Sequence, residues 1–363
     1  MEIKIKPKDL IEMLRIVEGG VSTTQKDIIS LSILLKKIKN KVFCISINED
    51  IEIVTYKEIK DSIEENVDVI LKYDLIYNIC RSIKDNSEIK IIKTNNSTEI
   101  HTKNSIFEVP LLYSSSFPSF RTEKKILFKT KIISSDLKLL FQYPFVTMSE
   151  NNQEDFLNGI LIDINNNSIN AIASDGVKTS FSQILIKECN NRLKIIIPKI
   201  LIKEFINTYQ ENEINIINIT ESYIKIINSK ITLTTRLINE IYENNLINIK
   251  YEKFTKIILE TYDLNKAINL LKTICTNNIL VLNSKVNKIM LTVKQKSEKG
   301  VVTLKAHLFG QELNLNLNFK HINIISKIIK SDKTEIIVPE NKTFLIIKEK
   351  NLNCIYVTLP LKI

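Results

Sequence analysis

Three similar segments recur along the chain at equal intervals, and this repeat restricts the possible folds more than any other feature. Each has a short run of β-forming residues followed by a helix start: IKIKPKDLIEMLRIV, FKTKIISSDLKLLFQY and IILETYDLNKAINLLKTI. The aspartates Asp9, Asp136 and Asp263 fall in register, 127 residues apart in each case. An aspartate that opens a helix accepts hydrogen bonds from first-turn amides and favours the positive end of the helix dipole. The pattern therefore indicates three tandem copies of one structural unit.

A second series with the same pattern lies between these segments: VDVILKYDLIYNICRSI, LKIIIPKILIKEFINTY and LNLNLNFKHINIISKII. The expected helices begin near residues 9, 73, 136, 199, 263 and 321, so the chain holds six half-units of similar length. The helices are amphipathic, and in the first one Leu10, Leu14 and Val17 share a face. The stretches after each helix are β-branched or alternating and end in Asn, Asp or Ser, which predicts antiparallel hairpins.

Each half-unit is therefore a strand, a helix and a meander of strands, and two half-units make a domain of common size. We expect an α+β fold of three tandem domains. The boundaries are placed in the Ser- and Pro-containing segment YSSSFPSFRTEKK and in the polar segment INEIYENNLINIKYEK. This division predicts domains at 1–122, 123–247 and 248–363.

Composition is that of a soluble globular protein, with 44% hydrophobic and 25% charged residues. The formal charge of +10 favours a polyanionic partner such as nucleic acid, although a solvated lysine-rich surface would give the same charge. Five scattered cysteines without a Cys-x-x-Cys pair predict reduced thiols in a cytosol. The charged N-terminal segment does not resemble a signal peptide, and no apolar run approaches the ~18 residues that span a bilayer. We therefore expect a cytoplasmic protein without membrane contact.

Convergent reactive groups are hard to find in the sequence. The histidines His101, His307 and His321 have no ligand-like spacing, and the glycines form neither a dinucleotide-binding nor a phosphate-binding loop. Asp175, in the segment SDG, is interpreted as a turn residue between two strands. His321 begins an expected helix on a basic face and is interpreted as a surface or DNA-facing residue rather than a base. We predict no catalytic residue, metal or cofactor, and the alternative is an enzyme whose site assembles from scattered residues.

Five further motifs follow in order: FPSF (117–120), FLNGILIDI (156–164), AIASDGVKTSF (171–181), IIIPKILIKEF (195–205) and YVTLPLKI (356–363). Together with the length and the repeat, they resemble the bacterial sliding clamp, the β subunit of the replicative DNA polymerase, over the whole chain. The resemblance implies a non-catalytic head-to-tail homodimer that closes into a ring, with the helices inside and the sheets outside. Such a ring encircles duplex DNA and makes the polymerase processive. The alternative is a basic repeat scaffold that binds nucleic acid without encircling it.

A ring holds DNA topologically, so cations on its inner face need supply only a weak, salt-screened and base-independent attraction. We expect these cations on the helices or at their entries. The same side chains would also suit the solvated faces of amphipathic helices. The expected DNA-binding residues are Arg15, Lys72, Arg81, Lys138, Lys199, Lys203, Lys266, Lys272, Lys320 and Lys327.

In this family, short peptides from the polymerase catalytic subunit, the clamp loader complex, other polymerases and repair proteins insert apolar side chains between the second and third domains. An apolar chain end such as VTLPLKI suits a groove that a partner covers. For Leu157 and Val357 the alternative is core packing, and for the last residues it is fraying. The matching segments give a pocket of Leu157, Ser174, Gly176, Val177, Thr179, Thr343, Val357, Thr358, Leu359, Pro360, Leu361, Lys362 and Ile363.

The sequence departs from the family pattern at three positions. Glu154 stands where an arginine usually flanks the pocket, Glu243 stands where a proline is expected, and Asp155 stands where an aromatic residue is common near the DNA. These residues change the charge of the pocket rim and one DNA contact. They leave the apolar centre of the pocket intact.

Self-association is expected at two places that match the interface positions of the family. Phe107 and Val109 lie in the strand-like segment SIFEVPL, and Ile274 and Cys275 lie near the end of a helix in the third repeat. An unpaired strand edge has to be covered or blunted, and pairing with a second subunit is one solution. The alternative is an edge that is covered within one monomer.

Overall fold

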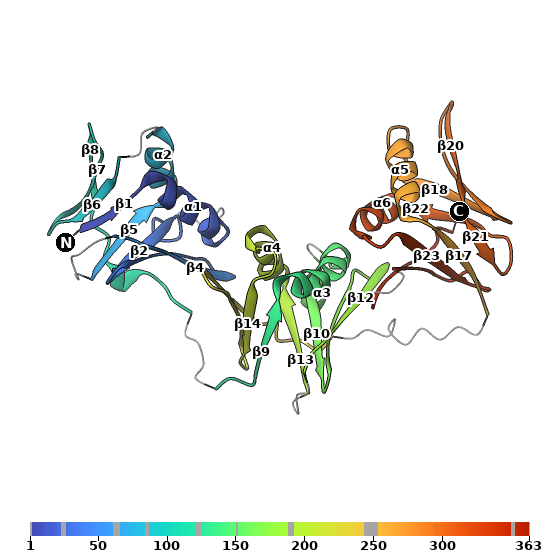
Figure 1. Cartoon of the computed structure of the whole chain (residues 1–363), viewed down its shortest axis with the longest axis horizontal. Helices are drawn as coiled ribbons and strands as arrows, with labels where there is room; N and C mark the ends of the chain where they lie inside the picture. The colour runs from blue at the N-terminus through green and yellow to red at the C-terminus, as the bar shows by residue number, and fades with distance from the viewer. Residues whose placement is uncertain are drawn as a thin grey trace. The chain divides into compact units, whose positions relative to one another are not determined.

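A computed structural model describes residues 2–22, 27–60, 66–83, 87–120, 125–149, 152–187, 192–242, 253–349 and 353–362 (Figure 1). The predicted domain boundaries at 122/123 and 247/248, together with Cys189, Glu243 and Ile363, lie outside these residues. The chain forms two compact units. The first combines Met1–Ser135 with Ile200–Leu237, and the second combines Asp136–Lys199 with Ile238–Ile363.

The first unit contains two antiparallel sheets. The larger has the order β5 (Val67–Lys72), β2 (Ser32–Ile38), β3 (Lys41–Ile47), β4 (Ile51–Glu58), β16 (Ile231–Arg236), β15 (Tyr223–Ile227), β14 (Ile214–Ile219) and β9 (Phe128–Ile133). The smaller has the order β1 (Glu2–Ile5), β6 (Ile89–Lys93), β7 (Ser97–His101) and β8 (Ile106–Pro110). The helical segments are α1 (Pro7–Val17), η1 (Glu18–Gly20), α2 (Tyr73–Ser82), η2 (Ser114–Ser116) and α4 (Lys199–Thr208), whose first residue belongs to the second unit.

The second unit repeats this organisation. Its larger sheet has the order β13 (Leu193–Pro198), β10 (Gly159–Asn165), β11 (Ser168–Ser174), β12 (Lys178–Leu185), β25 (Cys354–Thr358), β24 (Leu345–Glu349), β23 (Lys333–Pro339), β17 (Phe254–Glu260) and β21 (His307–Phe309). Its smaller sheet has the order β20 (Glu298–Lys305), β19 (Lys288–Gln295), β18 (Ile279–Lys285) and β22 (Asn314–Asn318). The helical segments are α3 (Ser134–Thr147), which starts two residues before this unit, η3 (Asp155–Asn158), α5 (Thr261–Lys272) and α6 (Phe319–Ile328).

Each larger sheet is a fusion of two meanders from different half-units, and the two fusions are equivalent. In the first unit β4 pairs with β16, with Ile51 opposite Thr235. In the second unit β12 pairs with β25, with Lys178 opposite Thr358. Ile51 and Lys178 are 127 residues apart, which is the repeat interval. The turns that precede β4 and β12, at 48–50 and 175–177, therefore occupy the same place in the repeat.

The amphipathic pattern correctly identifies the buried face of the first helix. Leu10, Leu14 and Val17 of α1 are all fully buried. Helix α1 lies beside α2 in the first unit, and α5 lies beside α6 in the second (Figure 1). Burial of this kind contributes about 1.5–3 kcal/mol per large aliphatic side chain, so packing of the apolar faces stabilises these short helices.

The repeated aspartates have a different role from the one expected. Asp9 and Asp263 are each the third residue of their helix, and the N-cap positions of α1 and α5 are held by Lys6 and Glu260. The carboxylate of Asp9 instead lies 2.8 Å from the Nζ of Lys57. These aspartates still carry negative charge in the first turn, where the helix dipole favours it, but they are not caps.

Candidate functional site

The SDG segment forms the turn between β11 and β12, as predicted. Gly176 has φ +88°, a conformation that glycine adopts without strain. Ser174 Oγ accepts from the Gly176 amide at 3.1 Å, and Asp175 Oδ1 accepts from the amides of Val177 at 3.0 Å and Lys178 at 2.8 Å. The turn is therefore held in one conformation. Val177 projects from it with 48% of its surface exposed.

Lys178 joins this turn to the end of helix α3. Its Nζ lies 2.9 Å from Asp175 Oδ2 and donates to the carbonyls of Val146 at 3.2 Å and Thr147 at 3.0 Å. Burial acts to raise the pKa of Asp175, but the hydrogen bonds and charge of Lys178 outweigh burial, so the pKa lies below its usual value. Lys178 was not predicted from the sequence. The only signal for it in the sequence was its position in the AIASDGVKTSF motif, between the predicted pocket residues Val177 and Thr179.

The terminal strand β25 lies between β12 and β24. Val357 is opposite Thr179 on one side and opposite Ile346 on the other, and Ile346 is near Ile337 of β23 in a small cluster. Val357, Ile337 and Ile346 are each at most 7% exposed, and Phe344 packs against them. In the isolated chain Val357 is therefore a buried residue. Leu157, at 9% exposed, is also buried.

The opposite side of β25 carries a polar contact to helix α6. His321 Nδ1 lies 3.0 Å from Thr358 Oγ1, and His321 is half-buried. Burial lowers the pKa of His321, the charge of Lys178 lowers it further, and Asp175 opposes both effects. His321 is therefore only partly at the surface, because one ring nitrogen contacts the terminal strand.

The residues after β25 are held in place. Leu359 is 39% exposed, whereas the Leu361 amide donates to the Asn316 carbonyl at 2.7 Å. Pro360 is half-buried and Lys362 is exposed. Up to residue 362 the tail therefore has a defined course against β22. The structure does not show the fraying that was the alternative here.

The structure brings the SDG residues 174, 176, 177 and 179 together with the tail residues 357 and 358 through strand pairing. Thr343 is exposed and donates to its neighbour Asn341 at 2.9 Å. Leu157 lies at the end of η3, where its carbonyl accepts from the Ser149 amide at 2.9 Å. Among the residues that the structure describes, no hydrogen bond joins Thr343 or Leu157 to the tail.

An aromatic cluster beside Leu157 was not predicted from the sequence. The rings of Phe156 and Tyr242 meet edge to face with centroids 5.3 Å apart. Both pack against a small core of β-strand residues that includes Leu161 and Ile196. The Phe156 amide also donates to Glu240 Oε2 at 3.0 Å. The cluster anchors η3, and with it Leu157, to the sheet.

The basic residues of the helices lie mostly in solvent. Lys138 and Lys199 are half-buried, and the Nζ of Lys199 lies 5.5 Å from the ring centre of Phe145. Lys203 is exposed and its Nζ lies 3.8 Å from Glu204 Oε1. The other candidates are exposed: Arg15, Lys72, Arg81, Lys266, Lys272, Lys320 and Lys327.

The expected self-association residues lie at or near sheet edges. Phe107, 38% exposed, and Val109 are on β8, which is an edge strand of its four-stranded sheet. Ile274 and Cys275 are half-buried and follow α5 directly. Burial raises the pKa of the Cys275 thiol. β20 is likewise an edge strand of the second unit.

Two of the three departures from the family pattern can be located. Glu154 precedes η3, and its amide donates to Asn152 Oδ1 at 3.0 Å. Glu154 and Asp155 are both exposed.

In the part of the chain that the structure describes, no helix has the length and apolar character to cross a membrane. The same residues include no group of three or more His, Cys, Asp or Glu side chains placed to hold a metal ion.

Tandem α+β units with basic helices, whose sheets fuse between half-units, define the class of DNA-clamp proteins. Residues 1–121 match the family model "DNA polymerase III beta subunit, N-terminal domain", and residues 131–244 match "DNA polymerase III beta subunit, central domain". The chain belongs to the DNA polymerase III beta subunit family. Members of this family are non-catalytic processivity factors.

Individual relatives agree with this assignment. The beta sliding clamp of Buchnera aphidicola subsp. Rhopalosiphum padi is 25% identical over 295 residues, covering 79% of this chain and 80% of the relative. The beta sliding clamp of Haemophilus influenzae is 18% identical over 376 residues and covers 100% of both chains.

Solved structures share the fold. The DNA polymerase III subunit beta of Pseudomonas aeruginosa has a TM-score of 0.91 at 17% identity and covers 100% of both chains. The DNA polymerase sliding clamp of Bacillus subtilis has a TM-score of 0.92 at 18% identity, covering 100% of this chain and 99% of that chain. These findings confirm the α+β fold class and the family expected from the sequence.

Proposed function

We propose that this chain is a DNA sliding clamp, a homodimeric ring that encircles duplex DNA and tethers the replicative DNA polymerase. The observation that carries the proposal is the family match across the first two repeats, joined to a clamp fold over the full chain. The proposed division into domains is 1–122, 123–247 and 248–363, and the proposed location is the cytoplasm. Each compact unit would then contain one terminal domain and half of the middle one.

The exposed cations of the helices are the proposed DNA-facing residues. Their support is chemical: Arg15, Arg81 and Lys272 sit in the last turns of α1, α2 and α5 and extend into solvent. A clamp that slides requires attraction without base recognition, and flexible exposed lysines and arginines provide it. Lys199 fits this role less well, because it is half-buried against Phe145.

Partner peptides are proposed to dock where the SDG turn meets the tail. Val177, in the fixed turn, is 48% exposed, and Leu359, directly after β25, is 39% exposed. Such residues are suited to contact the apolar anchors of a short peptide. Buried Val357 and Leu157 would form the floor of the site if the residues above them move when a peptide binds. The proposed partners are the polymerase catalytic subunit, the clamp loader complex, other polymerases and repair proteins.

The proposed dimer joins the edge strand of one subunit to the third repeat of the other, head to tail. Phe107 and Val109 of β8 would meet Ile274, Cys275 and the neighbouring edge strand β20 of a second copy. Pairing of two edges satisfies their free backbone groups and covers their exposed apolar residues. Two such contacts close a ring of two subunits.

Retention on DNA of different topology tests the function. The protein is loaded by its clamp loader onto nicked circular DNA, and half of the sample is then linearised with a restriction enzyme. A sliding ring remains on the circles and leaves the linear molecules through their ends. Equal retention on both forms would indicate adhesive binding and would favour the non-encircling scaffold. Sizing at several concentrations adds a second criterion, since a strict monomer at micromolar concentration contradicts the ring.

A further inference from the structure

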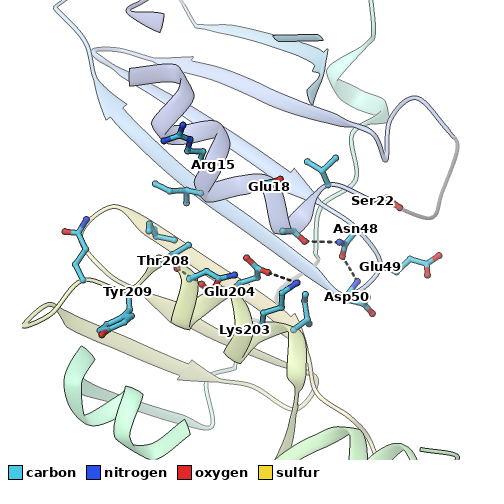
Figure 2. A pocket seen from close by; sticks show the side chains of 17 residues that line it. Arg15, Glu18, Ser22, Asn48, Glu49, Asp50, Lys203, Glu204, Thr208 and Tyr209 are labelled. Carbon is cyan, nitrogen blue, oxygen red and sulfur yellow. Dashed lines mark hydrogen bonds and ion pairs between the residues drawn. The ribbon is translucent and has the colours of Figure 1, made fainter. Parts of the chain in front are cut away.

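A cavity of about 950 Å³ lies within the first unit, between the end of α1, the β3–β4 turn and helix α4 (Figure 2). Arg15 and Glu18 approach it from α1 and η1, Asn48 and Asp50 from the turn, and Lys203 and Glu204 from α4. Except for Lys203 and Arg15, which were assigned to DNA, no function described above uses these residues.

The cavity occupies the place in the first unit that the SDG turn and the tail occupy in the second. The turn at 48–50 precedes the turn at 175–177 by the repeat interval of 127 residues. Thr235 of β16 lies opposite Ile51, just as Thr358 of β25 lies opposite Lys178. Each place is also bordered by the end of the preceding helix, α1 in one unit and α3 in the other.

The β3–β4 turn is as firmly held as the SDG turn. Asn48 Oδ1 accepts from the amides of Asp50 and Ile51, both at 2.9 Å, and Asn48 Nδ2 donates to the Gly19 carbonyl at 3.3 Å. Thr235 Oγ1 donates to the Asp50 carbonyl at 2.7 Å. This side of the cavity is therefore preformed, which lowers the entropic cost of binding a ligand.

Glu204 is the unusual group in the cavity wall. The residue is 5% exposed, and its carboxylate packs so closely on Gly19 that a Cβ there would lie 2.2 Å from the carboxylate carbon. Its ion pair with Lys203 is long, at 3.8 Å, and Lys203 extends largely into solvent. Burial raises the pKa of Glu204, nearby Glu18 adds to this effect, and Lys203 and Asn207 oppose it. A carboxylate that is this deeply buried in a cavity wall is a candidate for a functional role.

The charge of the cavity differs from that of the chain. Its lining contains four carboxylates, those of Glu18, Glu49, Asp50 and Glu204, and two cations, whereas the whole chain carries +10. A net negative cavity favours cationic ligands over anionic ones.

We propose that this cavity is a second docking site, which binds a basic segment of a partner protein with a lysine or arginine side chain on Glu204. The two equivalent places in the repeat would then select different partners, one by apolar anchors and the other by cationic ones. The inference goes beyond the proposed clamp function. It can be tested without DNA, so its failure is distinguishable from failure of the retention assay.

The test uses fluorescence anisotropy with labelled short peptides of alternating glycine and lysine, and of alternating glycine and glutamate. The intact protein should bind the lysine peptide in preference to the glutamate peptide. Glu204→Gln should weaken binding of the lysine peptide by about tenfold or more, since a buried charge-assisted contact contributes over about 1.4 kcal/mol. Glu312→Gln makes the same charge change on an exposed loop of the second unit and should leave the affinity unchanged.

A second variant distinguishes the effect of the position of the Glu204 carboxylate from the effect of its charge. Gly19→Ala keeps every charge but displaces the Glu204 carboxylate from its place, so it should also weaken binding of the lysine peptide. Circular dichroism verifies that both variants are folded. Equal affinities for the intact protein, Glu204→Gln and Glu312→Gln would overturn the proposal, because binding would then depend only on diffuse surface charge.

Discussion

Tyr143 of helix α3 donates a hydrogen bond from its hydroxyl to the carboxylate of Glu349 in strand β24, and both side chains are fully buried. The two residues are 206 positions apart and belong to different predicted domains. The other carboxylate oxygen accepts from the amides of Lys330 at 3.2 Å and Ser331 at 2.9 Å. One buried charge thus joins the helix that carries the SDG contacts, the strand beside the tail and the loop after α6.

Replacement of Tyr143 by phenylalanine should destabilise the second unit. The change preserves the ring but leaves a buried carboxylate without one of its donors, which costs about 1–3 kcal/mol. Thermal or urea unfolding measures the loss. The matched control is Tyr262→Phe, which removes a hydroxyl from an exposed tyrosine of the same unit and should change stability little. A Tyr143→Phe protein as stable as the control would mean that the hydrogen bond contributes nothing.

Asp175→Asn should destabilise the second unit at neutral pH, and the difference in stability from the parent protein should disappear at acidic pH. The folded-state pKa of Asp175 lies below its ordinary value of 3.8, so its contribution is present above that pH and is lost as the pH falls through the lowered pKa. The expected loss at pH 7 is about 1 kcal/mol, because the ion pair with Lys178 is partly buried. Urea unfolding at several pH values measures it. A difference between the two proteins that does not shrink on acidification would contradict this assignment.

Glu204→Gln should show the opposite behaviour. Burial raises the folded-state pKa of Glu204 above its ordinary value of 4.5, so the ionised form costs stability once the pH exceeds 4.5. The variant should therefore be more stable than the parent at pH 7, and the gain should disappear as the pH falls below 4.5. The same unfolding series as for Asp175 provides the measurement. A loss of stability at pH 7 would show that Lys203 and Asn207 compensate the charge fully.

The repeat predicted the half-units because its signal is local: β-forming residues, an acidic first turn and an amphipathic face all lie within about one helix length. The SDG turn follows from similarly local chemistry. The fusion of β4 with β16 could not be predicted in this way, because alternation within a strand specifies its buried face but not its lateral partner. The contact of His321 with Thr358 could not be predicted for the same reason.

Local sequence patterns also could not predict the environments of two polar residues, Lys178 and Glu204. Lys178 occupies a strand position where a lysine normally extends into solvent, and only the nearby end of α3 gives it two carbonyl acceptors. Glu204 lies on the buried side of α4 together with Ile202 and Phe205, whereas its neighbour Lys203 is exposed. An amphipathic pattern assigns glutamate to the solvent face. Its burial depends on the close approach of Gly19 from another half-unit.

Removal of residues 359–363 should abolish stimulation of the polymerase while dimerisation persists. The tail after β25 is attached through the Leu361 amide and Asn316, whereas the expected dimer residues lie on β8 and after α5. Leu359→Asp tests the same site with a single change, and Val286→Asp, at an exposed apolar position in a hairpin of the same unit, is its control. Primer extension on long templates should fall for Leu359→Asp and remain normal for Val286→Asp, with sizing unchanged for both. A truncated protein that elutes as a monomer would place the tail in the dimer interface rather than in the partner site.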